Sequence, residues 1–150
     1  MAACSDESAE VPARAPQQAE AEARLADRRW LDPLDKVAPE VWLASRMAQA
    51  DVTEADPDAV RIGKTLDAAA HHFHESQRMI ANRAVQLEGM LAGVPASEKA
   101  LDLIESLTDV VGSRAESFGA ICQQYYNLRS SGLGREEALS DLKHRYGGRT

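Results

Sequence analysis

The apolar residues in the middle of the chain recur at spacings that place them on one face of an α-helix. In the first of two stretches an apolar residue returns every seven positions, at Ala59, Leu66, Phe73, Ile80 and Leu87. In the second stretch the steps alternate between three and four, through Leu101, Ile104, Thr108, Val111, Ala115, Phe118, Cys122 and Tyr125. The two stretches predict two long amphipathic helices, over residues 57–92 and 97–131.

Capping residues stand at the ends of both predicted helices. Asp56-Pro57 fits a helix start, with the aspartate as N-cap and the proline in the first turn. Gly93 and Pro95 fit the end of the first helix, and Ser97 fits the start of the second. A connection this short makes the two helices antiparallel neighbours, which is a long helical hairpin.

Shorter helices are predicted on both sides of the hairpin. Residues 17–30 are rich in good helix formers, and residues 39–50 begin with a proline suited to a first helical turn. Residues 134–146 carry apolar side chains on one helical face. Aromatic residues make up only 5% of the chain, and runs of β-branched residues are missing, so strands are not expected. The sequence therefore predicts an all-α fold.

The length of 150 residues suits one domain. We expect a single helical domain over residues 17–146. Residues 1–16 are small, polar and proline-bearing, which favours a disordered tail. Residues 147–150 are expected to form a second, loose tail.

The apolar stripe of each predicted long helix is wider than a bare heptad seam. Leu107, Val110, Ile121 and Leu128 widen the stripe of the second helix. Short flanking helices cannot cover two helices that are each about 50 Å long at roughly 1.5 Å per residue. We therefore expect a homodimer, in which two hairpins form a four-helix bundle.

The charge of the chain is concentrated before the predicted hairpin. Residues 1–60 hold thirteen acids and six bases, whereas residues 61–150 balance, so the first part accounts for the net charge of −7. A basic face of the kind that binds nucleic acid is missing, which argues against a nucleic-acid partner. No apolar run approaches the ~18 residues of a membrane span, so no membrane association is expected.

The segment 30–47 is the richest in large apolar residues and holds both tryptophans. Such a segment must bury itself in the core or against another protein. The candidate partner-binding residues are Trp30, Trp42, Leu43 and Met47. The acidic surroundings of the segment favour a basic partner. The leading hypothesis is a non-enzymatic interaction or assembly protein without cofactors, which acts by self-association and by docking a protein partner.

A run of histidines offers a competing hypothesis. On one helix Asp67, His71 and His74 would share a face, and this set could bind zinc or another divalent ion. The His74-Glu75 pair on a long helical hairpin is also similar to the pair in the dimerisation and phosphoacceptor module of sensor histidine kinases. That resemblance implies histidine phosphotransfer through His74. It departs from the family at Met79, where those proteins carry a proline.

A third hypothesis is a small DNA-binding regulator. The chain near its end reads as helix, turn, helix, and the last helix carries Arg135, Lys143 and Arg145. Acids on the same helix oppose this interpretation, because phosphates would repel them. The two cysteines form no metal-binding spacing, and Cys122 on an apolar seam is expected to act as a small hydrophobic residue. Such cysteine usage is ordinary for a cytoplasmic protein.

Overall fold

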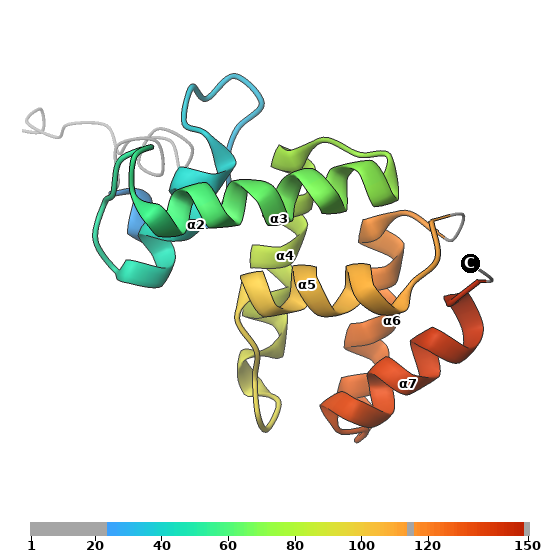
Figure 1. Cartoon of the computed structure of the whole chain (residues 1–150). Helices are drawn as coiled ribbons and strands as arrows, with labels where there is room; N and C mark the ends of the chain where they lie inside the picture. Colours follow the sequence, from blue (N-terminus) through green and yellow to red (C-terminus); the bar gives the residue numbers. More distant parts are fainter. Residues whose placement is uncertain (1–23, 114–115, 149–150) are drawn as a thin grey trace, which may run out of the picture.

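The computed structural model describes residues 24–113 and 116–148, and in these ranges every regular element is a helix (Figure 1). The all-α prediction is confirmed. The α-helices are α2 (Pro39–Ala48), α3 (Pro57–Phe73), α4 (Gln77–Met90), α5 (Ala100–Val110), α6 (Phe118–Ser130) and α7 (Arg135–Tyr146), and the single 3₁₀ turns are η2 (Leu25–Asp27) and η3 (Leu91–Gly93). None of the helices in the described ranges has the length and hydropathy needed to cross a membrane.

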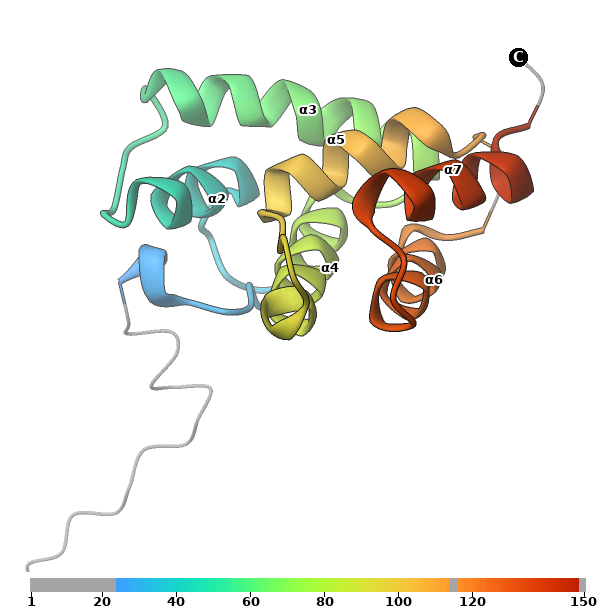
Figure 2. The same cartoon turned by 90° about the horizontal axis from the view of Figure 1, so that it is seen from below.

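Helices α4 and α5 lie at the centre of the packing, since α4 contacts α2, α3, α5 and α6, and α5 also contacts α3 and α7. Helices α3 and α5 run side by side, and α4 and α6 lie together on the side of the molecule away from α3 (Figure 2). All six α-helices contribute to one apolar core, whose largest fully buried side chains include Trp42, Ile62, Leu66, Ile80, Leu103, Ile104, Phe118 and Tyr125.

The prediction of one continuous helix over residues 57–92 is wrong, because the chain breaks after Phe73. His74 adopts a left-handed conformation with φ 57°, and its N–H donates to Ala70 O, which closes α3. Ser76 then caps α4, its hydroxyl accepting from the backbone N–H of Met79 at 3.1 Å. The apolar spacing runs through the break unchanged, so the heptad pattern alone did not reveal it.

The predicted helix over residues 97–131 is also divided in two. Helix α5 ends because Val111 is extended, with φ −105° and ψ 135°. The next residue, Gly112, donates its N–H to Tyr146 O at 2.6 Å. A Cβ at Gly112 would lie 2.9 Å from the backbone O of Gly147, so the end of α7 needs a glycine here. A contact with the C-terminal segment thus accompanies the break. Helix periodicity cannot reveal a contact between residues so far apart in the sequence.

Residues 97–99, predicted as the first turn of that helix, lie in the turn before α5 instead. A buried ion pair holds this turn. One carboxylate oxygen of Glu98 accepts from Arg129 Nη1 at 2.5 Å and from the Tyr125 hydroxyl, and the other accepts from Arg135 Nε at 2.9 Å. Arg129 also donates to Pro95 O at 2.7 Å. Burial raises the pKa of the Tyr125 hydroxyl, and the hydrogen bond to Glu98 is the second cause that raises it. Glu98 thus ties the turn to α6 and α7.

Two of the three short helices predicted beside the hairpin are present in the structure. The helices predicted over 39–50 and 134–146 are confirmed as α2 and α7. The described part of the helix predicted over 17–30 is wrong, because it contains only the turn η2 and continues as an extended chain from Arg28. Residues 17–23 lie outside the described residues, as does the tail predicted over 1–16.

Candidate docking site

Residues 28–38 connect η2 to α2 as a loop without regular structure, here called the 28–38 loop. Leu31 in this loop is fully buried. The side-chain amide of Asn82, itself buried on α4, bonds to both backbone groups of Leu31: its oxygen accepts from Leu31 N at 2.8 Å and its nitrogen donates to Leu31 O at 2.9 Å. An amide that satisfies both backbone groups of one buried residue fixes the loop to α4.

Further contacts fix the two ends of the loop. Arg28 Nη1 lies 2.5 Å from Asp35 Oδ2, and both side chains are largely buried. The carbonyl oxygen of Arg28 accepts from Trp42 Nε1 at 3.2 Å and from Arg46 Nη1 at 2.5 Å, so α2 holds the start of the loop. Arg78 Nη2 donates to the carbonyl oxygen near the loop's other end, Val37 O, at 2.9 Å. The loop is therefore anchored at its start, its middle and its end.

This anchored loop nevertheless presents two large apolar side chains to the outside. Leu34 is 90% exposed and Trp30 is 42% exposed. Leu34 stands at the top of a tight turn, in which Asp32 O accepts from Asp35 N at 3.0 Å and Asp32 Oδ1 accepts from Leu34 N at 3.0 Å. Proline precedes Leu34, which suits the second position of such a turn. The exposure of Leu34 is thus built into a fixed turn.

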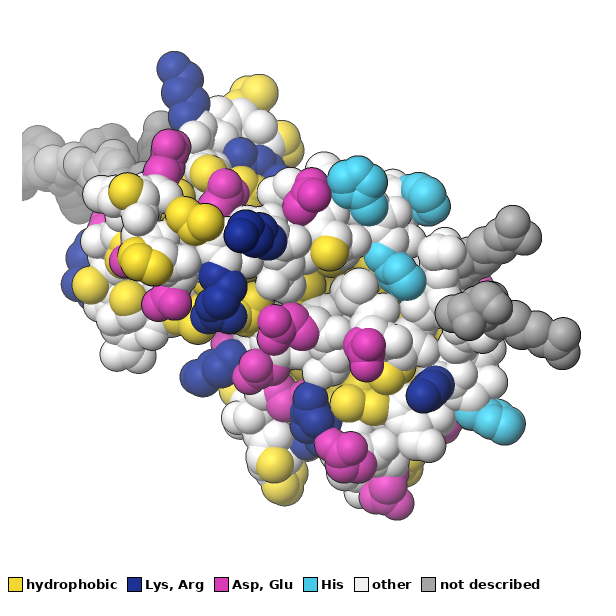
Figure 3. Space-filling view, in the orientation of Figure 1, with side chains coloured by type: hydrophobic (Ala, Val, Ile, Leu, Met, Phe, Trp, Pro, Cys, Tyr) yellow, Lys and Arg dark blue, Asp and Glu magenta, His cyan; other side chains and the backbone are white. Residues whose placement is uncertain are grey.

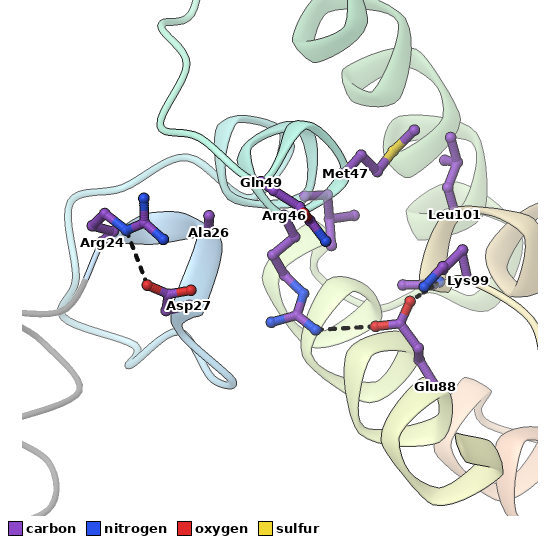
Figure 4. A pocket seen from close by; sticks show the side chains of 11 residues that line it. Arg24, Ala26, Asp27, Arg46, Met47, Gln49, Glu88, Lys99 and Leu101 are labelled. Carbon is purple, nitrogen blue, oxygen red and sulfur yellow. Dashed lines mark hydrogen bonds and ion pairs between the residues drawn. The ribbon is translucent and has the colours of Figure 1, made fainter. Parts of the chain in front are cut away.

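A pocket of about 590 Å³ lies beside the start of the loop (Figure 4). It opens between η2, α2, the end of α4 and the beginning of α5. Its lining combines apolar and charged side chains: Arg24, Ala26, Asp27, Leu43, Arg46, Met47, Gln49, Glu88, Lys99, Ala100 and Leu101.

The charges in the pocket are mostly paired with one another. Figure 4 shows Arg46 and Glu88 pointing toward each other, with Arg46 Nη2 3.0 Å from Glu88 Oε1. The other oxygen of Glu88 accepts from Ala100 N at 3.1 Å, at the beginning of α5. On the opposite side Arg24 Nε lies 3.0 Å from Asp27 Oδ2. The pairing leaves the pocket with mixed charge beside an apolar wall.

The four predicted partner-binding residues divide into two groups. Trp42 and Leu43 are buried in the core, although Leu43 also contributes to the lining of the pocket. Trp30 is exposed on the loop, and Met47 is 47% exposed at the pocket. Neither Leu34 nor Asn82 was predicted for this site. The signal available for the anchor was an asparagine beside Ala81 in a stretch with helical apolar spacing.

The predicted metal ligands are not assembled in this structure. His71 Nδ1 bonds to Asp67 O at 2.9 Å and lies 3.7 Å from the Asp67 carboxylate. His74 is the residue that ends α3, so it leaves the helical face that the prediction assumed. Across the part of the chain that the structure describes, no three His, Cys, Asp or Glu side chains are placed to hold a metal ion.

The His74-Glu75 pair lies in the break between α3 and α4 rather than within a helix. Glu75 Oε2 accepts from the backbone N–H of Phe118 at 2.8 Å, at the start of α6. His72 forms a hydrogen bond with Val111 O at the end of α5. On the face drawn in Figure 3, a group of histidine side chains lies at the C-terminal end of α3, and a further histidine side chain lies apart from this group. The ends of α3 and α5 and the starts of α4 and α6 meet in this region. Glu75 and His72 therefore have a structural role in joining these helix ends.

The cations of α7 are largely bonded within the protein. Arg135 donates to Glu98 and, through Nη2, to Ser106 Oγ at 2.6 Å. Arg145 Nε lies 2.6 Å from Asp141 Oδ1. On the face drawn in Figure 3, basic and acidic side chains alternate. This distribution differs from the continuous basic surface that DNA binding requires.

The thiol of Cys122 is buried on α6. Burial raises its pKa from the ordinary 9.0 to about 12. Because only the thiolate is nucleophilic, this group is chemically inert near neutral pH. Because burial disfavours the thiolate, titration of this group leaves stability unchanged below pH 9 and lowers it as the pH rises from 9 toward 12.

In a Cys4→Ser variant, Cys122 is the one remaining thiol. We expect a thiol reagent such as Ellman's reagent at pH 8 to leave the native protein unmodified and to react fully once denaturant is added. Rapid labelling of the native protein would show that α6 does not bury this side chain.

Comparison with known proteins extends over most of the chain. The MoxZ family model matches residues 40–147, from the first turn of α2 to the end of α7. Protein MoxZ of Paracoccus denitrificans is 30% identical over 141 residues, which cover 93% of this chain and 82% of that protein. No solved structure matches the chain. The 28–38 loop precedes the range that the family model matches.

Proposed function

The chain belongs to the MoxZ family, and we propose that it is a non-enzymatic accessory protein that works by self-association and by docking a protein partner. The observation that carries the docking half is the fixed exposure of Leu34 on the 28–38 loop. Isolated apolar residues are common on protein surfaces, so exposure alone means little. What supports docking is that the loop is anchored while its apolar side chains point outward.

Anchoring matters because ordering a loop during binding costs free energy. Asn82 and the Arg28–Asp35 pair already fix the backbone on both sides of Trp30 and Leu34. A partner that covers these side chains therefore gains the burial of a tryptophan and a leucine without ordering the loop. Tryptophan is among the residues that most often dominate binding energy at interfaces.

The proposed partner presents an apolar hollow flanked by basic side chains. The apolar hollow would take Leu34 and Trp30. Basic flanks are inferred from the charge of residues 1–60 as a whole, which carry seven more acids than bases, whereas the 28–38 loop itself holds three bases and two acids. Complementary charge of this kind mainly accelerates association and selects partners. The complex should therefore form more slowly at high salt.

Replacing Leu34 with aspartate tests the docking surface. The side chain is 90% exposed and makes no core contact, so the fold should keep its stability to within about 0.5 kcal/mol. Binding should weaken by at least roughly tenfold, because the interface then buries a charge in place of an apolar group. The measurement is affinity purification from the cells that produce the protein, followed by titration of the purified partner.

The matched control is Ala68→Asp, which places the same charge on an exposed position of α3. A partner retained by Ala68→Asp and lost by Leu34→Asp supports the proposal. A partner bound equally by both variants would place docking elsewhere on the molecule.

A further inference from the structure

Helices α4 and α6 form an outer face that is depleted of charge. On α4 the outward positions are Met79, Arg83, Gln86 and Met90, with steps of four, three and four. On α6 the same steps connect Gly119, Gln123, Tyr126 and Ser130. The two methionines are 38% and 39% exposed, and the glutamines are exposed as well. Two neighbouring helices thus present matching heptad-spaced stripes to the outside.

The two helices lie close together and run in the same direction. Glu75, just before α4, caps the first residue of α6 through its bond to Phe118 N. Further along, a Cβ at Gly119 would lie 3.4 Å from Arg83 Nε, so the absence of a side chain there gives Arg83 room. A groove of about 190 Å³ runs between the helices, lined by Arg83, Gln86, Leu87, Met90, Gly119, Cys122 and Gln123. The face is continuous across both helices.

Ionised groups are almost missing from this face, although 27% of the residues in the chain are charged. The charged residue of α6 is Arg129, which is buried against Glu98. On α4, Arg78 bonds to Val37 O and Glu88 to Arg46, both away from this face. Arg83 remains, and it donates to Gln86 at 3.2 Å. Charge depletion with methionine and tyrosine is the composition that marks the centre of protein interfaces.

We propose that this α4–α6 face binds a second copy of the chain, related by a twofold axis. The inference rests on the proposed self-association and assigns it to one surface. In a twofold contact each residue near the axis faces its own counterpart, so a run of like charges would repel itself. The α4–α6 face carries no carboxylate and one guanidinium. The outer face of α5, in contrast, presents Asp102, Glu105 and Asp109.

The resulting contact brings together α4 and α6 from each copy. It is a four-helix arrangement like the one expected from the sequence, although with two short helices per copy in place of an unbroken hairpin. The methionines at the two ends of the α4 stripe are flexible and suit a contact that must adapt to itself. Asn82, which anchors the 28–38 loop, is buried on α4 and is not one of the outward positions of this face.

Gln86→Lys tests the assignment, because it adds a second cation beside Arg83 near the centre of the face without removing a core contact. The wild-type chain should be a dimer by sedimentation velocity and light scattering over a wide concentration range. Gln86→Lys should raise the dimer dissociation constant at least roughly tenfold, since two cations from each copy then oppose those of the other. Ala68→Lys on α3 is the control and should remain a dimer. Circular dichroism checks that each variant is folded, and Gln123→Lys serves as an independent second variant.

Each outcome has a distinct meaning. Dissociation by Gln86→Lys or Gln123→Lys, with Ala68→Lys unaffected, supports the α4–α6 interface. A wild-type dimer that both glutamine variants leave intact overturns the assignment while self-association stands. A wild-type chain that is monomeric at every concentration overturns the assignment and the proposed self-association together.

Discussion

Replacing Arg129 with methionine is expected to destabilise the protein by about 3–5 kcal/mol, which is the usual effect of removing one partner from a buried ion pair. Arg129 is 3% exposed, and its guanidinium lies 2.5 Å from the buried carboxylate of Glu98. Without it Glu98 keeps only Arg135 and Tyr125, and the carbonyl oxygen of Pro95 loses its donor. Urea unfolding followed by circular dichroism measures the change.

The control for this prediction is an ion pair of the same kind at the surface. Arg145→Met removes the contact between Arg145 and Asp141 on α7, where solvent screens both charges, so the loss should be below about 1 kcal/mol. The double variant Glu98→Gln with Arg129→Met should recover part of the stability, because the core then no longer holds a carboxylate that has lost its buried guanidinium partner. Equal losses for Arg129→Met and Arg145→Met would contradict the account of the turn before α5.

Replacing Asn82 with alanine is expected to cost about 2–4 kcal/mol and to release the 28–38 loop. The substitution leaves the buried N–H and C=O of Leu31 without the partners that the structure gives them at 2.8 and 2.9 Å. Since the released loop must be ordered again during binding, partner affinity should fall even though Trp30 and Leu34 are unchanged. Hydrogen exchange at the Leu31 amide, together with urea unfolding, measures both parts of the effect.

Asn127→Ala supplies the comparison for this variant. Asn127 is exposed on α6. In the described residues, the hydrogen bond seen for its side chain is the one that it accepts from Gln123, one turn earlier on the same helix. Its replacement should change stability by less than about 0.5 kcal/mol and leave exchange at Leu31 as it was. Slow exchange at Leu31 in Asn82→Ala would show that the Leu31 side chain, rather than Asn82, holds the loop.

The local signals in the sequence predicted the helical class and several helix ends correctly. Asp56-Pro57 begins α3 as expected, with the Asp56 carboxylate accepting from Asp58 N at 2.8 Å. Pro39 begins α2 for the same reason. These signals succeed because capping depends on residues within one turn of each other.

The two helix breaks could not be read from the apolar spacing. Phe73 and Ile80 are seven residues apart, which would place both on one face of a straight helix. The broken chain also buries both side chains, so the spacing fits either arrangement. Ser76 and Ser117 are good N-caps, each accepting from the backbone three residues later, but serine within a helical pattern is common. The break before α6 also involves the contact of Gly112 with Tyr146 O, which is distant in sequence.

The candidate site was only partly accessible to sequence reasoning. The segment 30–47 was identified by its many large apolar residues. Their abundance does not predict which of them are buried in the core and which are exposed. Trp42 fills the core while Trp30, twelve positions earlier, stays exposed, because α2 turns one face inward and the loop lies outside it. The anchors Asn82 and Arg78 come from α4 and were invisible without the fold.

Docking through the 28–38 loop is the central claim, and photo-crosslinking from the loop tests it most directly. A photoreactive phenylalanine derivative placed at Leu34, and at Ala68 for comparison, would be activated in the cells that produce the protein. We expect an adduct with one protein from position 34 and none with that protein from position 68, and we expect the purified partner to bind the wild-type chain but not Leu34→Asp. Adducts that are the same from both positions, or no adduct from position 34, would contradict this claim.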